Sequence, residues 1–256
     1  MAALQIHQFP CLSDNFGVLI HDPATGMTAS IDVPDAEPVR QALAAKGWKL
    51  THILVTHHHA DHTQGVLPLK SQTGCTVIGP KNEAAKIKGL DRTVGGGDSF
   101  DFGGARVEVL DTPGHTAGHI TFYIPSAKVA FVGDTLFAIG CGRVIEGTPE
   151  MMWESLSRLA KLPGDTTIYC GHEYTQSNAR FALGIEPGNA ALVARAAEVD
   201  KLRAAGKPTL PTRLDVELET NPFLRPHIAA IRKQLGMETA ADWEVFAEIR
   251  ERKNRG

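Results

Sequence analysis

The segment 56–62 (Thr-His-His-His-Ala-Asp-His) concentrates side chains whose types and spacing suit metal binding. Imidazole binds zinc, iron and nickel, and a carboxylate among the imidazoles shifts the preference toward a hydrolytic or oxygen-rich site. One structural ion does not normally draw so many ligands from so short a segment. The alternative is a solvated polar loop, but the segment directly follows an apolar, β-branched run. We therefore predict a metal site here.

The run 52–56 (His-Ile-Leu-Val-Thr) predicts a strand that ends where the histidines begin. Side chains alternate between the two faces of an extended backbone. We therefore expect His57, His59 and Asp61 to share one side of the segment. His58 then points to the other side, where it is a satisfied or exposed polar residue.

Three further candidate ligands, His115, Asp134 and His172, each come just after a separate predicted strand. Sites in layered α/β proteins commonly collect on loops at one end of a sheet, held by rigid strands. The full set of candidate ligands is His57, His59, Asp61, His62, His115, Asp134 and His172. These five histidines and two carboxylates exceed the three or four ligands that one zinc takes from protein. Because they divide into two sets of three plus one shared carboxylate, we predict two metals.

The remaining pattern predicts an α/β first part and a helical second part. Strands are predicted at 4–9, 17–21, 28–32, 75–78, 106–111, 120–124, 129–132 and 166–170, and helices at 35–46, 63–73 (opened by His62) and 150–162. The glycine-rich segment 94–98 is expected to be a loop, because no Lys-Ser/Thr pair follows it. Beyond 174, helices are predicted at 189–205, 227–235 and 240–253. We place a boundary near 173, giving domains 1–172 and 173–256.

Composition and charge exclude several classes of partner. The 26 Lys and Arg against 29 Asp and Glu give a net charge of −3, with no long charge run, so neither nucleic acid nor an anionic membrane is expected. The N-terminal segment has no basic n-region or sustained apolar stretch, so no signal peptide is predicted. Four scattered cysteines without a C-x-x-C pair fit a reduced compartment. We expect a cytoplasmic monomer, with weak self-association as the alternative.

Several motifs resemble those of a known superfamily. The T-H-x-H-x-D-H segment at 56–62, the P-G-H-T at 113–116, the G-D-T at 133–135 and the G-H at 171–172 are similar to those of the metallo-β-lactamase superfamily. More closely, the segments 140–148, 170–175 and 221–225 (Asn-Pro-Phe-Leu-Arg) resemble the glyoxalase II, or hydroxyacylglutathione hydrolase, family. The resemblance runs from Leu12 to the C-terminus.

The resemblance implies a fold and a division of the ligands. The implied fold is α/β (α+β), a four-layer αββα sandwich with a C-terminal helical domain. His57, His59 and His115 would hold the first metal, and Asp61, His62 and His172 the second. Asp134 would bridge the two. The implied cofactor is a pair of divalent ions, Zn²⁺ foremost, with iron or manganese as alternatives.

The resemblance also implies a reaction, the hydrolysis of S-(2-hydroxyacyl)glutathione, typically S-D-lactoylglutathione, to glutathione and D-lactate. This is the second step of methylglyoxal detoxification. Two cations that share a water lower its pKa toward neutrality, which supplies hydroxide for attack on the thioester carbonyl. Asp61 and Asp134 are thus catalytic as metal ligands, and whether Asp61 also accepts a proton stays open. The thiol leaving group needs no strong general acid.

Substrate binding requires partners for the two carboxylates of glutathione. The positions that match the family's basic and tyrosine side chains are Arg143, Tyr174, Arg250 and Lys253. The alternative for Arg250 and Lys253 is that they are solvated residues at the end of a helix. One departure from many relatives is Ile145, where they have an aromatic residue, so one hydrogen-bonding or stacking contact is in doubt.

The sequence also leaves alternative functions open. A mononuclear-iron persulfide dioxygenase would not need the second ligand set, and a β-lactamase or nuclease of the superfamily fits the missing signal and basic surface poorly. A non-catalytic metal-binding module is the alternative from another class. His119 is expected to be structural, Asp111 either to contact a metal-binding histidine or to cap a loop, and Cys141 and Cys170 to be buried rather than nucleophilic.

Overall fold

The computed structural model describes residues 3–256 and divides the chain into two compact units. The first unit comprises Met1–Asp111 and Thr116–Gly133, and the second comprises Thr112–His115 and Asp134–Gly256. The predicted α/β class with a C-terminal helical region is confirmed. Within residues 3–256, no helix combines the length and the hydropathy needed to cross a bilayer.

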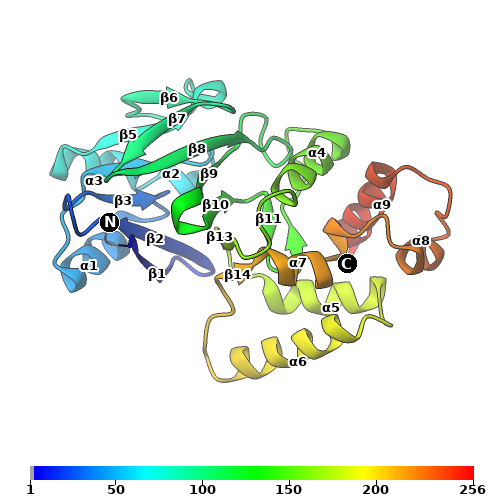
Figure 1. Ribbon diagram of the computed structural model, residues 1–256. Helices are drawn as coiled ribbons and strands as arrows, with labels where there is room; N and C mark the ends of the chain where they lie inside the picture. Colours follow the sequence, from blue (N-terminus) through cyan, green and yellow to red (C-terminus); the bar gives the residue numbers. More distant parts are fainter. Residues whose placement is uncertain (1–2) are drawn as a thin grey trace. The chain divides into compact units, whose positions relative to one another are not determined.

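The first unit contains a six-stranded mixed sheet whose strands follow one another in chain order (Figure 1). Its strands are β1 (Gln5–Cys11), β2 (Asn15–His21), β3 (Thr28–Ile31), β4 (His52–Leu54), β5 (Thr76–Pro80) and β6 (Arg92–Val94). The first three pair antiparallel, and the pairs from β3 to β6 are parallel. Parallel strands need crossover connections, which here carry the short helices and the histidine segment.

The helix α1 (Ala36–Lys46) forms where the sequence predicts it. The Asp35 carboxylate caps its first turn by accepting a hydrogen bond from the Glu37 N–H, and Gly47 ends it in the left-handed conformation with φ 68°. With α3 (Val66–Thr73), it packs on one face of the first sheet through Val39, Leu43, Ile53 and Leu69.

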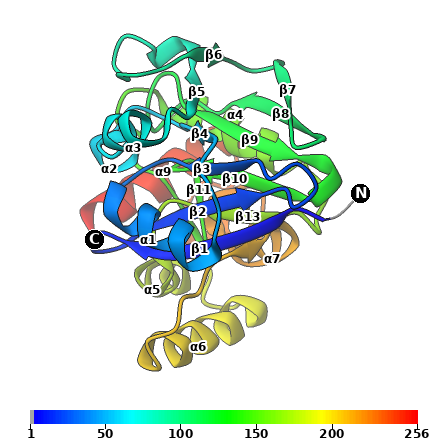
Figure 2. The same cartoon turned by 90° about the vertical axis from the view of Figure 1, so that its left-hand side faces the viewer.

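The second sheet lies against the opposite face of the first. Its strands β7 (Ser99–Phe102), β8 (Ala105–Asp111), β9 (Ile120–Ile124) and β10 (Val129–Gly133) are antiparallel neighbours in this order. The His52 ring of β4 meets the Phe102 ring of β7 edge to face, with centroids 5.6 Å apart. Helices, first sheet and second sheet therefore form three successive layers within this unit (Figure 2).

The second unit is mainly helical. It contains two small strand pairs, β11 (Leu136–Phe137) with β12 (Gly140–Cys141) and β13 (Thr167–Cys170) with β14 (Thr212–Arg213). Its helices are α4 (Pro149–Leu159), α5 (Thr175–Ile185), α6 (Ala190–Ala204), α7 (Leu214–Thr220), α8 (Ala229–Leu235) and α9 (Asp242–Arg255). The helices α5 and α6 pack side by side around Ala179, Ala182, Leu192 and Ala196 (Figure 1).

The structure corrects several local predictions. The predicted extended segment does not reach Asp61, because a helical turn, α2 (Ala60–Thr63), already begins after His59. The single helix predicted at 63–73 is interrupted, since α3 begins only at Val66. Val94 belongs to β6 rather than to the loop. The strands β6, β7, β11, β12 and β14 and the helices α5 and α7 were not predicted. Most of these elements are too short or too irregular to show a periodic pattern.

Candidate metal centre

In the first unit, one buried carboxylate orients two of the predicted ligands. Asp32 follows β3 with φ 53° and is 4% exposed. Its Oδ2 atom lies 2.8 Å from His62 Nδ1 and accepts a hydrogen bond of 2.8 Å from the Thr56 hydroxyl. That hydroxyl lies 3.0 Å from Nδ1 of His57. Because a carboxylate accepts, His62 carries its proton on Nδ1, and its Nε2 lone pair is left for a metal.

The rings of His57 and His59 present two nitrogens to one point. His57 Nε2 and His59 Nδ1 are 3.2 Å apart, and the two rings are nearly perpendicular. Two nitrogens bound at the usual ~2.0–2.1 Å to one tetrahedral zinc lie about 3.3 Å apart. The spacing of this pair therefore fits shared ligation of one ion.

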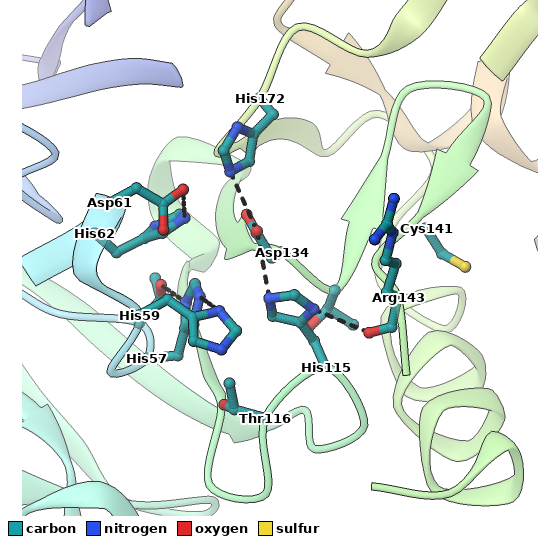
Figure 3. A network of polar contacts seen from close by, with 12 residues as sticks. His57, His59, Asp61, His62, His115, Thr116, Asp134, Cys141, Arg143 and His172 are labelled. Atoms are coloured by element: carbon teal, nitrogen blue, oxygen red, sulfur yellow. Dashed lines mark hydrogen bonds and ion pairs between the residues drawn. The ribbon is translucent and has the colours of Figure 1, made fainter. Parts of the chain in front are cut away.

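Asp61 and His62 lie on the single turn of α2, beside the loop that carries His57 and His59 (Figure 3). His62 Nε2 and Asp61 Oδ2 are 3.8 Å apart. The Asn15 amide holds Asp61 through hydrogen bonds to Oδ2 at 3.2 Å and to the main-chain oxygen at 3.1 Å. Asn15 thereby limits the rotation of the Asp61 carboxylate.

In the second unit, Asp134 lies between two imidazoles (Figure 3). Its Oδ2 atom is 3.5 Å from His115 Nε2 and 3.2 Å from His172 Nε2, and all three side chains are buried. His115 Nδ1 donates to the carbonyl oxygen of Arg143 over 2.9 Å, which directs its Nε2 lone pair toward Asp134. One carboxylate oxygen therefore lies close to a ring nitrogen of each of two buried histidines.

A close backbone approach holds this group together. A Cβ atom at Gly142 would lie 1.9 Å from the carbonyl oxygen of Asp134, so no other residue fits there. The Gly142 N–H donates to Thr135 O at 3.2 Å, and the Glu146 N–H donates to His115 O at 3.3 Å. The loop after β12 is thus fastened to the backbone of both His115 and the segment following Asp134.

The predicted substrate-binding residues Arg143, Tyr174, Arg250 and Lys253 line one cavity of about 770 Å³ in the second unit, which His115 and Asp134 also reach. The Tyr174 ring stacks on His172 at 4.8 Å. Arg250 is buried and donates to Cys141 O over 3.0 Å.

Lys253 extends the positive side of this cavity. It donates to Ser177 O over 3.1 Å. Burial, together with the neighbouring Arg250 charge, lowers the pKa of Lys253. An anion placed here would relieve the mutual repulsion of the two cations.

Three residues near the candidate ligands that the sequence analysis did not assign as metal ligands, His58, His119 and Asp111, have other partners. His58 lies 3.1 Å from Glu83 Oε2, and the buried His119 ring stacks on His57 at 4.8 Å. Asp111 accepts from the Gly96 N–H at 2.6 Å and so caps a loop. Asp32, Asn15 and Glu83 were not singled out from the sequence. Only the place of Asp32 at the end of a predicted apolar strand could have pointed to it.

Cysteine chemistry is disfavoured by burial. All four cysteines are buried free thiols, and burial raises the pKa of Cys141 to about 11 and that of Cys170 to about 12. At pH 8 only about one Cys141 thiol in a thousand is then ionised. We expect iodoacetamide at pH 8 to leave the native protein unlabelled in mass spectra and to label all four sites after denaturation. Rapid native labelling at Cys141 with loss of activity would contradict this expectation.

Two family models together match residues 17–256 of the chain. A family model described as "Metallo-beta-lactamase superfamily" matches residues 17–172, and one described as "Hydroxyacylglutathione hydrolase C-terminus" matches residues 173–256. Proteins named hydroxyacylglutathione hydrolase from Brucella anthropi and Brucella ovis are 59% and 58% identical over 251 residues. These alignments cover 98% of this chain and 96% and 98% of the relatives.

A solved structure with a similar fold is that of ETHE1 from Myxococcus xanthus, with a TM-score of 0.70 and 28% identity. The alignment covers 98% of this chain and 91% of the ETHE1 chain.

Proposed function

The chain belongs to the hydroxyacylglutathione hydrolases of the metallo-beta-lactamase superfamily, and we propose how its residues share the work of that reaction. It hydrolyses glutathione thioesters of 2-hydroxy acids, typically S-D-lactoylglutathione, to glutathione and the free acid. The observation that carries this conclusion is 59% identity over 98% of the chain to a hydroxyacylglutathione hydrolase. Because these relatives are named hydroxyacylglutathione hydrolase, they do not favour the alternative function of a mononuclear-iron persulfide dioxygenase. Direct assay of S-D-lactoylglutathione hydrolysis tests the conclusion.

Family membership and the histidine and aspartate clusters support a dinuclear site for divalent ions. The ligand division proposed here is His57, His59 and His115 for one ion, Asp61, His62 and His172 for the other, and Asp134 as the bridge. The ring spacing of His57 and His59 and the position of Asp134 Oδ2 between two imidazoles support it. Zinc is the proposed metal because imidazole and carboxylate ligands at these spacings suit it, with iron or manganese as alternatives.

When bound, the two ions supply hydroxide near neutral pH and polarise the thioester carbonyl. The protein's own residues hold the proposed metal ligands in fixed orientations. Asp32 fixes the tautomer of His62, and the Arg143 carbonyl fixes that of His115. Asn15 restrains Asp61, whose second oxygen is the atom we propose as a proton acceptor. The departing thiolate is stable enough near neutral pH to leave without a strong acid.

Glutathione is proposed to bind in the cavity lined by Arg143, Tyr174, Arg250 and Lys253. Its two carboxylates match the cationic lining, and the Tyr174 ring, stacked on His172, places an apolar wall beside the proposed metal ligand. Ile145 is 57% exposed and its side chain carries no hydroxyl group, so this position offers the substrate no side-chain hydrogen bond. Arg143 remains able to bind a carboxylate through two parallel hydrogen bonds.

Replacing Arg250 and Lys253 together by alanine is expected to raise KM for S-D-lactoylglutathione by about 10- to 100-fold, because hydrogen bonds to charged groups contribute roughly 1.5–3 kcal/mol. Metal content should stay at the wild-type value. Steady-state kinetics and elemental analysis measure both. Arg252→Ala is the matched control, since Arg252 lies on the same helix and pairs with Glu248 instead. An unchanged KM in the double variant would remove both residues from the binding site.

The domain boundary, the cellular location and the oligomeric state are also proposals. We place the catalytic domain at 1–172 and the helical, glutathione-binding domain at 173–256, which is where the two family models meet. We also propose a cytoplasmic location, which agrees with the free thiols, and a monomeric state, with weak self-association as the alternative.

A further inference from the structure

Glu83 is a buried acidic residue that the reaction described above does not use. It lies in the short 3₁₀ turn Lys81–Glu83 after β5 and is 2% exposed. A buried carboxylate loses its hydration, and hydrogen bonds from the protein must offset this loss. Both of its oxygens have donors from the same unit. Glu83 is therefore held as an acceptor, in a defined orientation.

The oxygen Oε2 faces the segment that carries the first histidines. It accepts a hydrogen bond of 2.7 Å from the His58 main-chain N–H and lies 3.1 Å from the His58 ring Nδ1. The His58 N–H belongs to the peptide that joins His57 to His58, so this hydrogen bond fixes the peptide plane next to His57, and His59 follows one residue later. One carboxylate oxygen thus contacts both the main-chain N–H and the ring of His58.

The oxygen Oε1 faces a second loop. It accepts a hydrogen bond of 2.9 Å from the Gly118 N–H and another from the Thr116 hydroxyl. Thr116 directly follows His115 in the chain. The approach is close, because a Cβ atom at Gly118 would lie 2.6 Å from the Glu83 Cγ atom. Glu83 therefore joins the His57–His59 segment to the residues that follow His115.

We infer that Glu83 is a positioning residue for the first metal, which holds the backbone beside each of its three histidines. The inference rests on the proposed assignment of His57, His59 and His115 to one ion. Residues that orient metal ligands without touching the metal typically change metal affinity by ~10- to 100-fold when replaced. Asp32 contacts a ring nitrogen of a proposed ligand, His62, whereas Glu83 accepts from residues that lie close to the proposed ligands in the chain.

The test compares zinc affinity of the full-length protein and its variants by competition with a chromophoric chelator. In Glu83→Gln, an amide N–H₂ replaces one accepting oxygen and meets the N–H of His58 or the donors of the other loop. We expect at least one of the two stepwise zinc dissociation constants to rise 10- to 100-fold. Thr116→Val, which removes one donor and keeps the carboxylate, should give a smaller rise in the same constant.

Asp91→Asn is the matched control. Asp91 also accepts a main-chain hydrogen bond in the first unit, from the Val77 N–H at 2.8 Å, but its carboxylate pairs with Lys70. It should lower the melting temperature without changing either zinc constant. Glu83→Gln and Thr116→Val with both constants at the wild-type value would overturn the inference, whatever their melting temperatures. Wild-type protein that binds no pair of zinc ions would instead overturn the proposed function.

Discussion

Asp134→Ala is expected to lose one of the two ions and to reduce kcat for S-D-lactoylglutathione at least ~1,000-fold. A bridging carboxylate supplies negative charge to both cations, and loss of a single preorganised electrostatic partner already lowers kcat by about 100- to 1,000-fold in other enzymes. In the structure, Asp134 Oδ2 lies 3.5 Å from His115 Nε2 and 3.2 Å from His172 Nε2. Elemental analysis and steady-state kinetics on the same preparation measure both effects.

Two controls separate the bridge from general damage at this position. Asp134→Asn keeps the size of the side chain and one oxygen but removes the charge, so an intermediate loss of metal and activity is expected. Circular dichroism should show that both variants are folded, because Asp134 follows β10 on a loop rather than in the apolar core. An alanine variant that keeps two ions per chain and full turnover would show that the bridging assignment is wrong.

The candidate ligands could be predicted because they follow, within a few residues, strands whose apolar pattern is visible in the sequence. The run 52–56 and the strand 106–111 illustrate this, since β4 and β8 cover most of both ranges. The alternation rule then failed at Asp61, because the backbone turns into α2 at Ala60 and no longer alternates. A rule of side-chain direction applies only as long as the backbone geometry that produces it.

The residues that support the ligands could not be predicted in the same way. Asp32 and Glu83 act through partners that lie 24 to 35 positions away along the chain, such as Thr56 and Gly118. A hydrogen bond from a carboxylate to a distant main-chain N–H depends on the tertiary fold and leaves no periodic pattern. The hairpin formed by β11 and β12 was missed for a different reason, because two-residue strands are too short to show alternation.

Removal of the metals by a chelator is expected to abolish more than about 99% of S-D-lactoylglutathione hydrolysis, because the proposed nucleophile is a hydroxide that forms only when the metals are bound. The described cavity is lined by Cys141 among others, but burial raises the pKa of that thiol to about 11. Activity should return on addition of about two equivalents of Zn²⁺ per chain, which imidazole ligands favour, and not with Mg²⁺, which prefers oxygen ligands.

The same preparation distinguishes the metal-dependent hydrolase from its rivals. Ions that bind only the folded protein stabilise it by mass action, so the melting temperature should fall on chelation and recover with the activity. Restoration that is complete at one equivalent, or that needs Fe²⁺ and oxygen, would favour a mononuclear iron enzyme. Chelated protein with less than about a tenth of an ion per chain and undiminished turnover would exclude metal-assisted hydrolysis. The ratio of metal to activity therefore tests the number of ions and their role together.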